Sequence, residues 1–415
     1  MADQLVTLRA ISWRDCCPWL IIARAFRLAI SLQLLTFATL GVLLAGFGWL
    51  VLGELLVTGM ERNGTVAPNT ISFHSTKDYL PRGSIPPPPA ICTPHSAWRA
   101  LADGPVYGVW GRLNAPYGFL LAAGSIGWRG TVYALGGALW TLAVWSWFGA
   151  AISRSAALQL TVDERPLLSH LFSHCAAKFA SHLMAPILPL LLVTGLTIVL
   201  FATIGVLAQW DASLWIAGIL WGPALVLAFT MAVVLLGLSV GWPLMWATIS
   251  SEGTDAFDAL SRSYSYPFQR PLHYLFYTLV AAVVGALGWF LVYHVADWVI
   301  HLCSWGASWT AGWSRIAEIT QPTGEGSASP AAGRAGTLLV ACWIGLVRTI
   351  ATAFTYSFFW TSTTAIYLLL RYDVDRTEMD EVHLTPQDET YGLPPLSTDE
   401  AGVPRVAGEE EKNDV

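Results

Sequence analysis

The sequence is short of charged residues. Only 12% of its 415 residues are charged, whereas 54% are hydrophobic. A soluble domain carries roughly a quarter of charged residues, so this chain could not cover a water-exposed surface without large apolar patches. The composition argues against an ordinary soluble enzyme and predicts a chain that lies mostly in lipid. The 21 Trp residues agree with this prediction, because Trp concentrates where a bilayer meets water.

The sequence also lacks the motifs of familiar catalytic and cofactor sites. It has six cysteines but no C-x-x-C pair, so neither a zinc site nor a thioredoxin-like site is predicted. It contains no G-x-S-x-G, Walker A or H-E-x-x-H motif and no dinucleotide-binding glycine motif after a strand. No basic patch interleaved with aromatic residues favours nucleic acid. We therefore expect no soluble catalytic domain, no metal, no cofactor and no nucleic-acid partner.

Six long apolar runs predict six membrane spans within a membrane domain of residues 33–371. The spans are expected over residues 33–58, 130–151, 183–207, 214–247, 272–293 and 337–370. The fourth and sixth exceed the roughly 20 residues that a span needs, so they must tilt, kink or extend past the membrane. The predicted fold is all-α, a polytopic membrane helix bundle of about six spans with amphipathic interfacial helices. Whether the sixth run is one helix or two stays open.

Charge is distributed unevenly along the chain. Residues 373–415 hold 13 acidic and 3 basic residues, so this tail is more negative than the whole chain, whose net charge is -6. Lys and Arg recur in residues 1–32, 152–182 and 248–271, which lie on one side of the membrane if the spans alternate. The positive-inside rule then places both termini in the cytoplasm. We expect a cytoplasmic N-terminal interfacial helix over residues 1–32 and, over residues 372–415, a disordered cytoplasmic tail with solvated acidic residues.

Two segments are predicted on the outer side. Residues 59–129 form a large outer loop, whose aromatic second half should lie on the outer leaflet. Residues 294–318 carry apolar residues at helical spacing, which predicts an outer surface helix with a Trp stripe. Cys92 and Cys303 both fall outside and could pair in an oxidising periplasm. The stripe consists of Val295, Trp298, Leu302, Trp305, Trp309, Trp313 and Ile316.

Three inner segments are amphipathic. Residues 16–31, 153–180 and 252–270 each combine an apolar face with basic residues, which predicts helices in the headgroup plane that favour anionic lipid. Aligning Leu171 with Leu260 makes the last two segments resemble each other, although chance similarity between apolar helices explains this equally well. The expected partners are membrane lipids, with other membrane proteins as a second class. The oligomeric state is left open.

Two stretches carry a resemblance to known proteins. The ending YLLLRYDVDRTEMDEV, from Tyr367, resembles the end of a group of uncharacterised bacterial multi-pass membrane proteins, and AISRSAALQL, from Ala151, is similar to another stretch of that group. More loosely, the units of interfacial helix and span resemble the membrane domain of some glycerophosphodiester phosphodiesterases. The resemblance covers about residues 150–382 and implies an all-helical fold in the bacterial cytoplasmic (inner) membrane. The catalytic barrel of the phosphodiesterases has no counterpart here, so their activity is not implied.

Arg348 is the ionisable residue that stands out within the spans. A stripe of hydroxyl side chains follows it at helical spacing along the sixth run: Thr352, Thr355, Ser362 and Thr363. A charge at membrane depth usually faces a bundle interior or water, so this stripe could line a transport path. Alternatively, the span begins after Arg348, which then reaches the outer interface while the hydroxyls bond to their own helix.

His294, Asp297 and His301 share one face of the predicted Trp-striped helix. Such a set could bind zinc or relay protons, but it also lies opposite the Trp stripe, where a surface helix is polar. We expect the polar face. From the sequence, we expect a non-catalytic multi-pass integral membrane protein that organises the membrane or assists partner proteins. The first alternative is a secondary transporter or channel that uses the Arg348 stripe, and the second is a membrane-embedded lipid enzyme.

Overall fold

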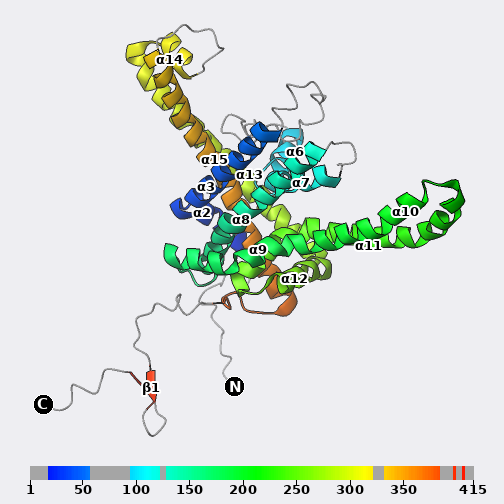
Figure 1. Ribbon diagram of the computed structural model, residues 1–415. Coiled ribbons are helices and arrows are strands. Elements are labelled where there is room, and N and C mark those ends of the chain that lie inside the picture. The colour runs from blue at the N-terminus through cyan, green and yellow to red at the C-terminus, as the bar shows by residue number, and fades with distance from the viewer. Residues whose placement is uncertain are drawn as a thin grey trace. The chain divides into compact units, whose positions relative to one another are not determined.

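The computed structural model is almost entirely helical. It describes residues 17–56, 94–121, 128–320, 331–383, 396–398 and 404–406. Its first unit, Met1–Val382, contains all the helices (Figure 1). They are η1 (Pro18–Leu20), α2 (Ile21–Ala29), α3 (Leu32–Leu56), α6 (Pro94–Ala102), α7 (Tyr107–Leu121), α8 (Trp128–Thr161), α9 (Leu168–Leu196), η4 (Thr197–Phe201), α10 (Ala202–Leu207), η5 (Asp211–Ser213), α11 (Leu214–Glu252), α12 (Ala256–Gln269), α13 (Pro271–Ala311), α14 (Trp313–Thr320) and α15 (Ala331–Asp375).

The second unit, His383–Val415, contains two three-residue strands. β1 (Leu396–Thr398) pairs antiparallel with β2 (Pro404–Val406). The tail was predicted to be disordered, and this short hairpin departs from that prediction. A strand pair of this length adds little stability of its own, because an isolated hairpin is only marginally stable in water.

Six helical stretches in the described part of the chain are long and apolar enough to cross a membrane. They are Leu32–Leu56, Gly130–Thr161, Leu168–Leu207, Asp211–Glu252, Pro271–Ala311 and Ala335–Asp375. The prediction of an all-α bundle of about six spans is therefore confirmed, and the chain is a multi-pass membrane protein. The last run, left open by the sequence, is one continuous helix.

Several helices are longer than the sequence predicted. α13 continues without a break through residue 293 to Ala311, so most of the predicted Trp-striped surface helix is the far end of the fifth span. The helix ends at Gly312, and Trp313 and Ile316 of the stripe lie on α14. The predicted interfacial helix 153–180 is instead divided between the end of α8 and the start of α9. In the first case no helix breaker lies at the expected boundary. In the second, the polar residues of α8 are buried against other helices rather than exposed in the headgroup plane.

The two other amphipathic segments do form separate helices. α2 buries Ile22 and Ala25, while Arg27 is exposed and the half-buried Arg24 pairs with Asp163 at 2.9 Å. α12 begins where the Asp255 side chain accepts a hydrogen bond of 2.9 Å from a backbone N–H, which caps the first turn. Both helices pack against α15, so their apolar faces contact other helices.

Three fully buried stretches form the packed core of this unit. Every residue is buried from Gly149 to Thr161 in α8, from Gly241 to Ser251 in α11 and from Ala353 to Arg371 in α15. Beyond this core, the far ends of α9–α11 and of α13–α15 form two projecting hairpins (Figure 1). Large apolar side chains on these hairpins are exposed, as expected for a lipid-facing surface.

Where proline interrupts a helix, tryptophan side chains donate hydrogen bonds to the backbone carbonyls that lack a helical donor. Pro186 in α9 has no N–H to donate to the carbonyl of His182, one turn earlier. The indole N–H of Trp246, from α11, donates to that carbonyl at 2.8 Å. The buried carbonyl thereby keeps a partner, which explains how the proline is tolerated inside an apolar helix.

A second hydrogen bond of this kind connects α7 to α11. Pro243 in α11 leaves the carbonyl of Ser239 without its helical donor, and the indole N–H of Trp110 donates to it at 2.8 Å. Val109 is fully buried next to Trp110. The aromatic second half of the predicted outer loop therefore packs against α8 and α15 and does not lie on a leaflet surface.

Helices α3 and α8 interlock through two reciprocal Trp–Gly contacts. Trp49 of α3 covers Gly137 of α8, and Trp140 of α8 covers Gly48 of α3. The Trp49 indole donates to the Thr141 hydroxyl at 2.9 Å, and the Trp140 indole donates to a carbonyl of α3. Only glycine leaves room for either ring, so this pair is fixed in register.

Candidate functional site

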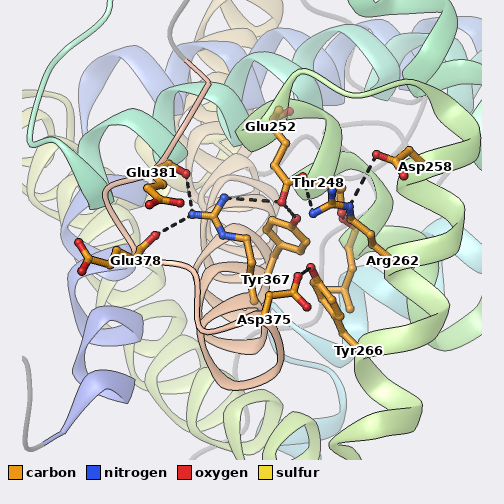
Figure 2. A network of polar contacts seen from close by, with 12 residues as sticks. Thr248, Glu252, Asp258, Arg262, Tyr266, Tyr367, Asp375, Glu378 and Glu381 are labelled. Carbon is orange, nitrogen blue, oxygen red and sulfur yellow. Dashed lines mark hydrogen bonds and ion pairs between the residues drawn. The ribbon is translucent and has the colours of Figure 1, made fainter.

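A network of ion pairs and hydrogen bonds closes one end of the packed core (Figure 2). At its centre is Arg371, on the last turns of α15 and only 3% exposed. One guanidinium nitrogen lies 3.6 Å from a carboxylate oxygen of Glu252, at the end of α11. Another donates to the backbone carbonyls of Glu378 and Glu381, at 3.0 and 2.7 Å. A buried cation therefore holds the segment that follows α15 against the core.

Glu252 connects three elements. Its carboxylate forms an ion pair of 2.7 Å with Arg262 of α12 and accepts a hydrogen bond from the Tyr367 hydroxyl of α15. The position is fixed by Gly253, whose positive φ of 65° ends α11 and whose N–H bonds back to the helix. The carboxylate is thus shared by two arginines and a tyrosine, which ties α11, α12 and α15 together.

Two tail carboxylates are also engaged. The Tyr277 hydroxyl donates to Asp373 at 2.7 Å, and the Tyr266 hydroxyl donates to Asp375. Burial, followed by the bond to Asp375, raises the pKa of Tyr266 above its usual 10, so the phenol stays protonated and can donate. The tail was expected to carry solvated acidic residues. Asp375 is exposed and Asp373 is half-buried, and each accepts a hydrogen bond from a tyrosine of α12 or α13.

A second buried arginine lies in α8. Arg154 is 1% exposed and donates to the Ser250 carbonyl of α11 at 3.0 Å. The Ser250 hydroxyl lies 3.1 Å from Nε2 of His182, and Nδ1 of His182 lies 2.9 Å from the Lys178 carbonyl. Since a carbonyl only accepts, Nδ1 carries the proton and Nε2 accepts from the serine. This chain links α8, α11 and α9 in the core.

The arrangement is suited to holding helices together. Glu252, Asp373 and Asp375 each have hydrogen-bonded or ionic partners, so none is poised as a free general base. Over the residues that the structure describes, no group of three or more His, Cys, Asp or Glu side chains could hold a metal ion. The network fixes the ends of four helices and the start of the tail in one arrangement.

Sequence reasoning missed this network. Its members are widely separated along the chain, and Arg154 and Arg371 fall at the ends of apolar runs, where an interfacial position explains a charge equally well. A usable signal was present in α8, because a polar stretch that continues an apolar helix without a break can be buried. The pairing of Glu252 with Arg371 required the three-dimensional arrangement.

The predicted Arg348 stripe is split by the structure. Arg348 is exposed on the far part of α15, Thr352 is half-buried, and Thr355, Ser362 and Thr363 lie in the packed core. The Thr355 and Ser362 hydroxyls donate to carbonyls of their own helix, at 2.7 and 3.1 Å. These residues are therefore not brought together on one polar surface.

The set His294, Asp297 and His301 lies on the far part of α13. Asp297 and His301 are exposed, and the half-buried His294 ring lies 2.8 Å from the carbonyl of Phe290. Cys303, also exposed, lies on the same helix, whereas Cys92 is outside the described residues, so their pairing stays a prediction. A small apolar crevice of about 50 Å³ lies at the tip of the α9–α11 hairpin, lined by residues such as Phe201 and Trp221.

The fold therefore defines a class, a multi-pass α-helical membrane protein with a packed core and two exposed apolar hairpins. Comparison of the chain with protein-family models, with curated proteins and with solved structures gives no match.

Proposed function

We propose that the protein is a non-catalytic scaffold of the bacterial cytoplasmic membrane, with both termini in the cytoplasm, that organises lipids or holds partner membrane proteins. The main support is that single helices have one part buried in the core and another part exposed. Residues 241–251 of α11 and 353–371 of α15 are completely buried, whereas the parts of these helices that project from the core expose large apolar side chains, including Phe229 and Leu339. A rigid core thus presents long apolar surfaces to whatever lies around it.

The polar network supports a mechanical role for the core. Buried charges such as Arg371 and Arg154 are tolerated only when other groups satisfy them, and both have such partners here. Removing one partner leaves a buried charge uncompensated, so the helices are held in one arrangement. A scaffold needs this fixed geometry, whereas a transporter needs two interchangeable ones.

Site-specific photo-crosslinking in cells tests the proposal. A photoreactive phenylalanine analogue replaces Phe229 on the α11 hairpin, which is 71% exposed, and separately Phe257 on α12, which is 72% exposed. We expect Phe229 to yield adducts with lipid or with a few membrane proteins that Phe257 does not yield. Identical adducts at both positions, or none at Phe229, would contradict the scaffold.

A flux assay distinguishes the transporter alternative. Purified protein in liposomes is compared with Arg348→Ala under ion and solute gradients. We expect the two to be equally inactive. Flux that depends on Arg348 would overturn the scaffold proposal in favour of transport.

A further inference from the structure

Two opposite charges lie exposed on the α13–α15 hairpin. We define the distal arm as residues 294–311 of α13 and 331–350 of α15. Arg348 and Asp297 are both exposed on this arm, and neither has an ion pair or hydrogen bond to another residue of the described chain. Both belong to stretches apolar enough to span a membrane.

The two charges lie at similar depth along the hairpin. At about 1.5 Å per residue, Arg348 is about 25 Å from the start of α15 at Ala331, and Asp297 is about 21 Å from the end of α13 at Ala311. The helices are antiparallel, with Gly285 against Phe358 and Gly288 against Phe354. Continuing this register places Asp297 within about one turn of the level of Arg348.

Lipid is a poor environment for both side chains. An arginine side chain can extend toward water only over the length of its own stem. Charged residues in spanning helices almost always face other protein or water, where they are paired. The aromatic and aliphatic side chains around them, Trp298 and Trp343 among them, are also exposed. The distal arm therefore has the composition of an uncovered protein interface with a charged centre.

We propose that the distal arm docks against the distal arm of a second copy of this chain, with Arg348 of each copy paired to Asp297 of the other. Arg348 and Asp297 carry opposite charges at similar depth on the arm, so this pair is complementary to itself. The other arginine of the arm, Arg334, lies about 21 Å from Arg348 along α15. Under two-fold symmetry, Arg348 of the first copy meets Asp297 of the second, and Asp297 of the first meets Arg348 of the second, so both pairs form together. A partner bearing a charge of one sign would leave the other charge uncompensated. This inference goes beyond the proposed scaffold function, because the test for a dimer does not depend on which lipids or proteins the scaffold organises.

Charge exchange tests the pairing. Arg348→Asp, Asp297→Arg and the double variant are each reconstituted in lipid nanodiscs, and copies per particle are counted by native mass spectrometry. We expect dimers for the unmodified protein, monomers for each single variant, and dimers again for the double variant. Co-expression of the two single variants should also restore dimers, each containing one copy of each variant, because every arginine then faces an aspartate across the interface.

The co-expression arm separates this dimer from a pair within one chain. An intrachain pair is restored only by the double variant, so rescue there without rescue on co-expression would overturn the proposal. A monomeric unmodified protein, or single variants that remain dimeric, would overturn it as well. Arg348→Gln and Asp297→Asn, which introduce no repulsion, should weaken the dimer by at least tenfold in dissociation constant while leaving the circular dichroism unchanged. Arg315→Asp on α14, whose partner Glu318 is local, is the matched control and should remain dimeric.

Discussion

We predict how much stability the bundle gains from the hydrogen bond that Trp246 donates to the carbonyl left without a donor by Pro186. Trp246→Phe removes the only side-chain N–H that donates to the His182 carbonyl among the described contacts, a bond of 2.8 Å in a fully buried environment. Leaving a buried carbonyl without a partner costs about 1–3 kcal/mol. The smaller ring also loses part of its stacking on Trp360, whose centroid is 4.6 Å away. The single variant therefore mixes a hydrogen-bond loss with a packing loss.

Pro186→Ala separates the two contributions. Alanine restores a backbone N–H at position 186, which can donate to the same His182 carbonyl as in an uninterrupted helix. We expect Trp246→Phe to cost about 1 kcal/mol less in the Pro186→Ala background than in the unmodified protein, because the carbonyl then keeps a donor. Unfolding in mixed micelles with increasing SDS, followed by far-ultraviolet circular dichroism, measures the free energy of unfolding for all four proteins.

Trp360→Phe is the matched control for ring size. Its indole nitrogen is buried without a hydrogen-bond partner within the described residues, so the substitution loses packing alone. Its cost should be the same with and without Pro186→Ala. If Trp246→Phe also costs the same in both backgrounds, within about 0.5 kcal/mol, the carbonyl repair contributes nothing and the reasoning is refuted.

Three further predictions concern the network, the α3–α8 interlock and pH. Glu252→Gln should lower the free energy of unfolding by about 3–5 kcal/mol and speed proteolysis after Asp375, because Arg371 loses its buried counter-ion. Glu318→Gln, in an exposed pair, should cost less than about 1 kcal/mol. Equal effects would contradict the buried ion pair between Glu252 and Arg371. Gly137→Ala should cost about 1–3 kcal/mol because Trp49 fills the site, whereas Gly195→Ala, with open space around it in a helix, should be neutral or slightly stabilising in the same SDS titration. Burial raises the pKa of Tyr264 to about 12, so its contribution to stability should be complete below pH 10 and lost between about pH 10 and 12; Tyr264→Phe should flatten that part of the pH–stability curve, and an unchanged slope would exclude Tyr264 as a cause.

The sequence was sufficient for the number and type of spans because apolar length alone determines them. It was insufficient for the helix ends. Periodicity in residues 294–318 indicated helix, but it could not show that the helix continues from the preceding span or that it ends at Gly312. Amphipathicity has the same ambiguity, since a polar residue can be exposed, as Arg27 of α2 is, or can join a buried network, as Arg154 does at the end of α8.

The candidate site was harder to predict for a related reason. Arg348 was singled out because a charge inside an apolar run is visible in one dimension. Arg371 and Glu252 end their runs, where charges are ordinary, and they become notable only when the helix ends converge. Pairings between distant segments depend on helix packing, which one sequence does not specify.

The hydrogen bonds from Arg371 to the segment after α15 determine which sequence changes that segment can tolerate. The guanidinium bonds to the carbonyls of residues 378 and 381, which every amino acid possesses, and makes no bond to the glutamate side chains themselves. These two bonds therefore depend on the arginine and on the number of residues between it and the carbonyls, and not on the side chains at 378 and 381. Substitutions of the side chains at 378 and 381 should therefore be tolerated, whereas inserting or deleting a single residue between Arg371 and these carbonyls should break the bonds.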